Sequence, residues 1–234
     1  MTRITFGNWL KQALALMGRA PLVWAGYLVF IGMLLGVGRI SLMLGVFLAV
    51  SCLFVGVGIA KYIDMRSSAE NSVGFYWALN KSLPLALLAA SSIVLCWFVF
   101  RAIANVYSGE VFKISQFFFY WEFTADNLDD KSMRQITGWL YSSAIVTLLF
   151  VLLMLTTFAS WFSYPLMLFK HYSWSQAKEQ GNKAFSKHQA AMYKLLGFIF
   201  AVVLIGGGIM PLLSPALYVL VSVLMYVSYR DVFE

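Results

Sequence analysis

The stretch that decides the fold is LLGFIFAVVLIGGGIMPLLSPALYVLVSVLMYVSY, residues 195–229, which holds no charged side chain between Lys194 and Arg230. A helix needs about 20 apolar residues to cross a bilayer core roughly 30 Å thick, so this stretch is too long for one untilted helix. Glycines and prolines between Gly206 and Pro215 interrupt it, and proline breaks or kinks a helix. The sequence therefore predicts two short spanning helices joined by a tight turn. The alternative is a single broken helix, which would give five spans in all.

The composition of the whole chain agrees with a membrane location. Of its 234 residues 61% are hydrophobic, 17% are aromatic and 12% are charged, whereas soluble domains carry roughly 25% charged residues. A soluble fold of this size cannot hide so much apolar surface, so the excess has to face lipid. We expect an all-α, polytopic transmembrane protein with one transmembrane domain, residues 1–234, built from three helical hairpins. The predicted spans are 20–38, 40–60, 82–104, 139–162, 193–209 and 213–230.

The distribution of charge predicts the orientation. Cytoplasmic loops of membrane proteins are enriched in Lys and Arg. With the N-terminus inside, most of the 17 basic residues are cytoplasmic, and only Arg39, Lys113, Lys131 and Arg134 lie outside. We therefore expect both termini in the cytoplasm. The net charge of +7 fits the anionic inner leaflet. Nucleic acid is not an expected partner, because the chain has no run of Lys and Arg.

A repeated pattern precedes three of the predicted spans. Ala15-Leu16 is followed by Pro21-Leu22, and Ala78-Leu79 is followed at the same spacing by Pro84-Leu85. A third copy begins at Ala184-Phe185 and lacks the proline. We interpret each copy as an amphipathic interfacial helix that bends at its end and turns into the bilayer. Tryptophans upstream in each copy are expected in the headgroup zone: Trp9, Trp77 and Trp174.

The C-terminal third carries a resemblance. Its features are Tyr164-Pro165, the Lys-rich stretch from Ala177 to Phe185, and the ending Tyr226-Val227-Ser228-Tyr229-Arg230-Asp231-Val232-Phe233. In these the chain resembles an uncharacterised family of bacterial multi-pass inner-membrane proteins that end in Ser-Tyr-Arg-Asp-(Ile/Val)-Phe. The resemblance covers mainly residues 160–234. It implies a multi-pass topology and no reaction or substrate.

Two sets of polar residues are candidate contact sites. Arg101, Asn105 and Ser108 would form one polar stripe on a continuing helix. The stripe is interpreted either as an anion or headgroup contact or as an arginine that reaches the outer interface. The second set belongs to a basic amphipathic segment expected on anionic lipid: Lys178, Lys183, Lys187 and Lys194.

Small residues predict close helix contacts. Gly32 and Gly36 in the first span are expected to face Gly56 and Gly58 in the second. Hydroxyl-bearing residues of the fourth span are expected to bond carbonyls of their own helix. No Asp or Glu falls inside any predicted span, which counts against a proton- or sodium-coupled carrier.

No catalytic, cofactor or metal signature is present among the usual motifs, so we do not expect an enzyme, a cofactor or a metal. The expected function is a non-catalytic scaffold or accessory subunit of a membrane assembly, in contact with anionic lipid and with a membrane-protein partner or a second copy. One alternative is a small permease or channel for a neutral or anionic solute. Another is a role in lipid handling.

Overall fold

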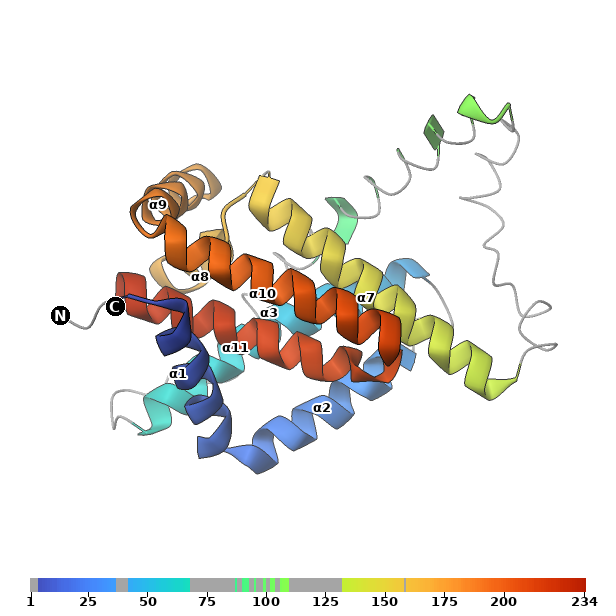
Figure 1. Cartoon of the computed structure of the whole chain (residues 1–234), viewed down its shortest axis with the longest axis horizontal. Coiled ribbons are helices and arrows are strands. Elements are labelled where there is room, and N and C mark those ends of the chain that lie inside the picture. Colours follow the sequence, from blue (N-terminus) through green and yellow to red (C-terminus); the bar gives the residue numbers. More distant parts are fainter. Residues whose placement is uncertain are drawn as a thin grey trace.

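The computed structural model describes residues 4–36, 42–67, 132–157 and 159–234, together with isolated residues between 87 and 109. Within these ranges the ordered elements are helices, and Figure 1 shows them gathered into one bundle. They are α1 (Phe6–Arg19), α2 (Pro21–Gly36), α3 (Leu42–Ser67), α7 (Met133–Thr157), α8 (Ser163–Lys170), α9 (Trp174–Lys187), α10 (Gln189–Ile209), the short η2 (Pro211–Leu213) and α11 (Ser214–Phe233).

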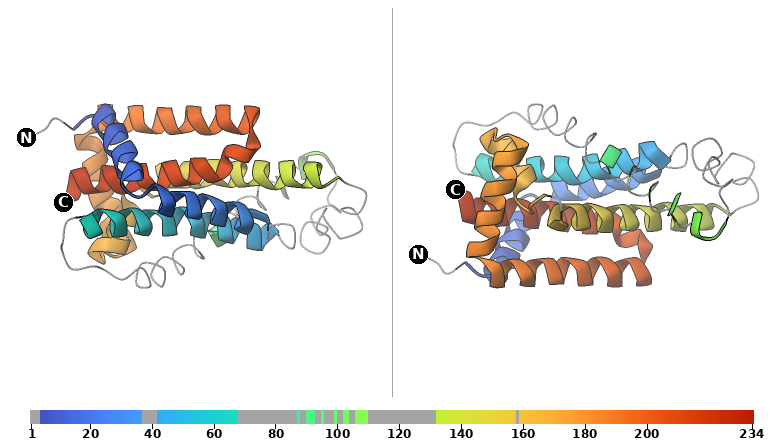
Figure 2. Two further views of the ribbon diagram at one scale, coloured as in Figure 1. Left: turned by 90° about the horizontal axis from the view of Figure 1, so that it is seen from below. Right: turned by 90° about the horizontal axis from the view of Figure 1, so that it is seen from above.

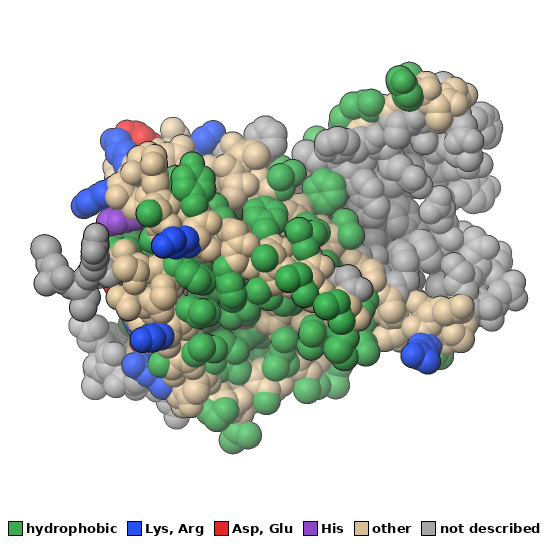
Figure 3. Space-filling view, in the orientation of Figure 1, with side chains coloured by type: hydrophobic (Ala, Val, Ile, Leu, Met, Phe, Trp, Pro, Cys, Tyr) green, Lys and Arg blue, Asp and Glu red, His purple; other side chains and the backbone are tan. Residues whose placement is uncertain are grey.

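Four helices in the described residues are long and apolar enough to cross a membrane. A fifth candidate span is α1 with α2, if this bent pair counts as one. Figure 3 shows hydrophobic side chains over the middle of the bundle, whereas Lys and Arg side chains gather at the end where α1 and α9 lie. This distribution is the one expected of a helical membrane protein. The four windows are Leu44–Met65, Met133–Thr157, Gln189–Gly206 and Pro211–Phe233.

The first predicted bend is present. α1 ends at Arg19, the chain turns by 93° and α2 begins at Pro21. Proline suits this first helical position, because its missing N–H would have no partner there. α2 has 16 residues and spans about 24 Å, which is short for a bilayer core. α2 therefore begins at the predicted bend, and residues 37–41 lie outside the described ranges.

Residues 195–229 form two helices rather than one broken helix. α10 ends at Ile209, η2 holds the turn at Pro211–Leu213, and α11 starts at Ser214. Figure 2 shows α10 and α11 side by side, and each contains its own candidate span. The interpretation of this stretch as a single broken helix is wrong.

The predicted third span, 82–104, lies largely outside the described residues.

The predicted fourth span, 139–162, is displaced. α7 runs from Met133 to Thr157, and residues 159–162 form a buried turn into α8. Tyr164 and Pro165 lie buried at the start of α8. The Tyr164 hydroxyl donates a hydrogen bond to the Phe54 carbonyl of α3 at 2.9 Å, which fixes this short helix against the bundle.

The described copies of the predicted repeat share their N-caps and their buried positions, at an offset one residue from the predicted one. Thr5 and Ser173 are both N-caps, and each accepts a bond from the backbone N–H three residues on. When Thr5 is aligned with Ser173, Leu16 is aligned with Ala184. The predicted repeat aligned Ala15 with Ala184 instead. The second copy, at residues 78–85, lies outside the described ranges. The buried positions correspond at this offset: Trp9, Ala13 and Leu16 in α1 with Ala177, Gly181 and Ala184 in α9, and Trp24, Tyr27, Ile31 and Leu35 in α2 with Met192, Leu195, Ile199 and Val203 in α10.

α11 is the central helix of the bundle, and 78% of its apolar window is buried. It packs against α1, α2, α3, α7, α8 and α10. Tyr218, Ser222 and Tyr226 recur at every fourth position, which places them on one stripe of the helix. The Tyr218 hydroxyl donates to the Ala144 carbonyl of α7 at 2.7 Å. The other two bond α3, so this stripe ties the central helix to both neighbours.

Three consecutive carbonyls of α3 accept side-chain hydrogen bonds from three different helices. The Cys52 carbonyl accepts from Tyr27 of α2, the Leu53 carbonyl from Ser222 of α11 at 2.8 Å, and the Phe54 carbonyl from Tyr164 of α8. A helical carbonyl already accepts from the N–H four residues on, so each of these oxygens uses its second lone pair. The middle of α3 is therefore the point where α2, α8 and α11 meet.

Gly56 makes this approach possible, and its partner differs from the prediction. A Cβ at Gly56 would lie 2.5 Å from Ser222 Oγ and 3.3 Å from the Tyr27 ring. The nearest neighbour of Gly56 is therefore Ser222 of α11, and the next is Tyr27 of α2. The expected neighbours were Gly32 and Gly36 of α2. Gly32 instead approaches the Tyr141 hydroxyl of α7, and a Cβ at Gly36 would meet nothing within 4 Å. Gly58 is also buried.

The Gly56 contact gives a test of the packing. Gly56→Ala should destabilise the protein by about 1–3 kcal/mol, because the added methyl forces α3 and α11 apart. Gly26→Ala is the matched control, since a Cβ at Gly26 would meet nothing within 4 Å. Unfolding titrations of both variants in the same detergent micelle measure the difference. Equal stability of the two variants would contradict this account of the α3–α11 contact.

Candidate functional site

Asp64 is the acidic residue that the sequence reasoning missed. The candidate span of α3 runs to Met65, so both Lys61 and Asp64 belong to it. The prediction that no acidic residue occurs inside a span is therefore wrong. Asp64 is only 9% exposed. A carboxylate so placed needs charged and hydrogen-bonding partners to offset its lost hydration.

Two arginines and a tyrosine supply those partners. Arg19 of α1 lies 3.1 Å from Asp64 Oδ1, and Arg230 of α11 lies 2.6 Å from Oδ2. The Tyr226 hydroxyl donates to the same Oδ2 at 2.9 Å. Arg230 also donates to Gln12 of α1 at 2.6 Å. We call these five residues the Asp64 cluster; it joins α1, α3 and α11.

Helical spacing places members of the cluster on the faces of their helices that meet. Tyr226 and Arg230 are four residues apart and share one face of α11, as do Lys61 and Asp64 approximately on α3. α1 buries Trp9 on the face next to Gln12, and the Trp9 indole donates to Asp231 at 2.8 Å. Trp9 is therefore buried in contact with α11. The prediction that Trp9 lies in the headgroup zone is wrong.

The C-terminal motif, residues 226–233, packs against other helices at this end of the bundle. Ser228 accepts a hydrogen bond from Trp161 at 2.9 Å, and Lys61 pairs with Glu234 at 2.9 Å. Lys170 donates to the Phe233 carbonyl at 2.9 Å. These contacts fix the end of α11 to α3 and to the buried turn and short helix after α7. The terminal motif thus has a packing role in this structure.

The chemistry of the Asp64 cluster is that of a clamp. The carboxylate is shared by two guanidinium groups, and one of these is bound to an amide as well. Such a group is stabilised in its charged form. Arg19 donates to Asp64 Oδ1, and Tyr226 and Arg230 donate to Oδ2, so these three partners use most of the acceptor sites of the carboxylate. Within the described residues no group of three or more His, Cys, Asp or Glu side chains is placed to hold a metal ion.

The predicted polar stripe is only partly described. Arg101 and Asn105 lie outside the described residues, and Ser108 is exposed in a turn beside Gly109, whose φ is +76°. Three hydroxyls of the predicted fourth span bond carbonyls of their own helix as expected, whereas Ser160 lies after the end of α7 and accepts a hydrogen bond from the Phe162 N–H. Ser142 donates to the Gly138 carbonyl at 2.9 Å, and Thr156 and Thr157 also bond carbonyls of their own helix.

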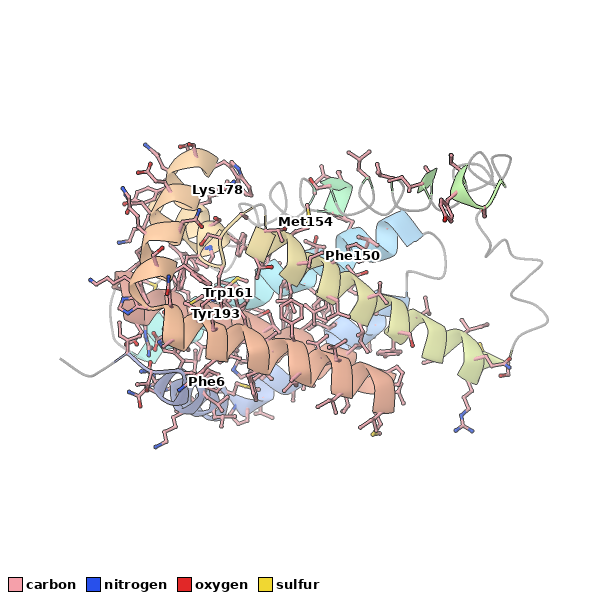
Figure 4. All side chains as sticks on the ribbon, turned by 45° about the horizontal axis from the view of Figure 1, so that its top comes forward. Phe6, Phe150, Met154, Trp161, Lys178 and Tyr193 are labelled. Atoms are coloured by element: carbon pink, nitrogen blue, oxygen red, sulfur yellow. The ribbon has the colours of Figure 1, made fainter. Side chains whose placement is uncertain are left out.

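The four lysines predicted to contact lipid lie on different surfaces of the protein, three on α9 and one on α10. α9 lies across the bundle end (Figure 2) and rests on its small-residue face; a Cβ at Gly181 would lie 2.7 Å from the Ser160 Cβ. With about 3.6 residues per turn, Lys178 lies on one flank of that face, and Lys183 and Lys187 on the other. Figure 4 shows Lys178 on α9 and Tyr193 near the start of α10. Lys194 is exposed on the outer side of α10.

Charge on this end is dominated by cations. The hydrogen bond from Lys183 lowers the pKa of Glu179, the acid of the segment, so it stays ionised and paired at 2.7 Å. Burial, followed by the nearby Lys187, lowers the pKa of His188 below its usual value, and Asp231 opposes this only in part. His188 is therefore neutral at pH 7, and the positive charge of α9 comes from its lysines.

The Asp64 cluster predicts an order of mutational effects. Asp64→Asn should cost the most, on the order of 2–4 kcal/mol, because it leaves two arginines without their anion. Arg230→Gln should follow, and Arg19→Gln should cost least, since the Arg19 side chain is 50% exposed and that of Arg230 is 28% exposed. Unfolding titrations in micelles measure the three changes. Equal losses for the two arginine variants would sink the assigned order.

Comparisons with protein-family models, with curated proteins and with solved structures find no match to this chain. The function of the protein is therefore inferred from its own contacts. The described part of the chain offers an all-helical bundle with four to five candidate spans, a clamp around Asp64 and a basic end formed by α1 and α9.

Proposed function

We propose that this chain is a non-catalytic scaffold or accessory subunit of a membrane assembly, a six-span protein of the bacterial inner membrane with both termini in the cytoplasm. The observation that supports this most is the Asp64 cluster. Its carboxylate, the kind of group on which a coupled carrier or a hydrolase depends, is bound to two arginines and a tyrosine. The charge serves to hold α1, α3 and α11 in place.

The outer surface supports the same proposal. Because α11 fills the centre of the bundle, α2 and α10 keep apolar side chains on their outer faces, for example Leu22 at 86% and Ile209 at 74% exposure. Lipid or another membrane protein covers such faces in a bilayer. At the basic end α1 and α9 lie across the spans, where they are accessible from the cytoplasm. This arrangement gives a rigid body that offers contacts on its outside.

Part of the basic end fits anionic lipid. Lys178 shares its flank of α9 with Trp174, which is 52% exposed, and with Phe185, whose ring packs at 5.5 Å against Tyr193 of α10. Aromatic rings beside lysines are typical of the headgroup zone. Lys194 points outward one turn into α10, from where its long side chain reaches the headgroups. We assign the lipid contact to Lys178 and Lys194.

Co-purification tests the scaffold proposal. The tagged chain, extracted from native membranes in a mild detergent, should retain another membrane protein in a fixed ratio through two chromatographic steps. An unrelated tagged inner-membrane protein of similar size is the control. Recovery of the chain alone in several mild detergents and in native lipid discs would count decisively against a scaffold or an accessory subunit.

The lipid assignment has its own test. Replacing Lys178 and Lys194 together by Gln should reduce the anionic phospholipid that co-purifies, at about 1 kcal/mol for each lost cation near the surface. Replacing Lys11, exposed on α1, is a control for net charge. Native mass spectrometry measures the bound lipid. An unchanged ratio of anionic to zwitterionic lipid in the double variant would contradict the assignment.

A further inference from the structure

The two copies of the repeat use the same flank in different ways. At the offset that places Thr5 on Ser173, Gln12 of α1 corresponds to Gln180 of α9, and Arg19 corresponds to Lys187. In both helices these residues lie on the same side of the buried face. In α1 this flank is occupied: Gln12 accepts from Arg230, and Arg19 bonds Asp64. The flank of α1 is thus a receptor for the charged ends of two helices.

In α9 the corresponding flank is open. Gln180, Lys183 and Lys187 are all exposed. Among the described residues Lys183 has one partner, its exposed neighbour Glu179, and no hydrogen bond or ion pair engages Gln180 or Lys187. An ion pair between exposed neighbours on one helix is weak and readily exchanged. Among the described residues, α9 therefore carries a flank like that of α1, with one more cation and without the helix ends that contact it in α1.

We propose that the Gln180–Lys183–Lys187 flank of α9 binds an acidic segment of another membrane protein. A carboxylate of that segment would form an ion pair with Lys187, as Asp64 does with Arg19 in α1. This inference rests on the proposed scaffold function and names the chemistry of the partner. The occupant of the α1 flank, the end of a helix with Asp64, is the internal precedent. The aromatic side chains that mark a lipid contact lie on the opposite flank, with Lys178. A protein carboxylate therefore fits the Lys187 side better than a headgroup does.

The experiment places a photoreactive amino acid at Gln180 in the full chain, in native membranes. Its control is the same amino acid at Asn182, which is exposed on the other side of α9. From Gln180, but not from Asn182, the label should attach to a peptide of another membrane protein within one helical turn of an Asp or Glu. Attachment to phospholipid alone, to peptides without a nearby acid, or equally from both positions would overturn the proposal.

Charge exchange then tests the ion pair itself. Lys187→Glu should lower the cross-linked yield by about tenfold, and Lys11→Glu, an equal change of charge on α1, should not. Replacing the mapped acidic residue of the partner by Lys should restore the yield with Lys187→Glu. An unchanged yield with Lys187→Glu overturns the docking site while a co-purified partner still upholds the scaffold. Absence of any partner for the unaltered chain overturns the scaffold itself.

Discussion

The second hydrogen bonds accepted by the carbonyls of residues 52–54 are the contacts on which the bundle depends. Apolar side chains gain little by leaving lipid for a protein interior, so close packing and hydrogen bonds must specify how helices associate in a bilayer. Tyr27, Ser222 and Tyr164 bring such bonds to adjacent carbonyls of α3. A hydroxyl reaches a helical carbonyl only where no side chain blocks it, and Gly56 leaves that space beside Ser222. Together these contacts position α2, α8 and α11 around one point.

The Asp64 cluster extends the same principle to the end of the bundle. At this end the helices are joined by charged side chains in place of the hydroxyl-to-carbonyl bonds of the middle. The Asp64 carboxylate accepts hydrogen bonds from two guanidinium groups and a phenol. Buried ion pairs often contribute little net stability, because the charges lose hydration. Their geometry nevertheless excludes other arrangements, since a slip of α1 along α11 would leave Arg230 or Asp64 without a partner. We therefore see the cluster as a device that sets the register of α1 on the bundle.

Features carried by local sequence could be predicted, and those created by distant pairing could not. The turn in residues 195–229 follows from its glycines and prolines, and the bend before α2 follows from Pro21. The charge-free windows ended the second span before Lys61, but α3 continues because Lys61 and Asp64 meet Glu234 and Arg230 at the far end of the chain. Trp9 similarly looked like a headgroup residue, since nothing near it in sequence indicates its bond to Asp231.

The repeat shows how one pattern can acquire two roles. Both amphipathic helices keep their cap, their buried positions and a basic last residue, because these features determine how such a helix lies across a bundle end. The buried face differs between the two helices: Trp9 packs against α11, whereas the missing side chain of Gly181 leaves room for the Ser160 side chain. The polar flank is free of that packing constraint. The proposed exchange of an internal carboxylate for an external one therefore requires no change in the fold.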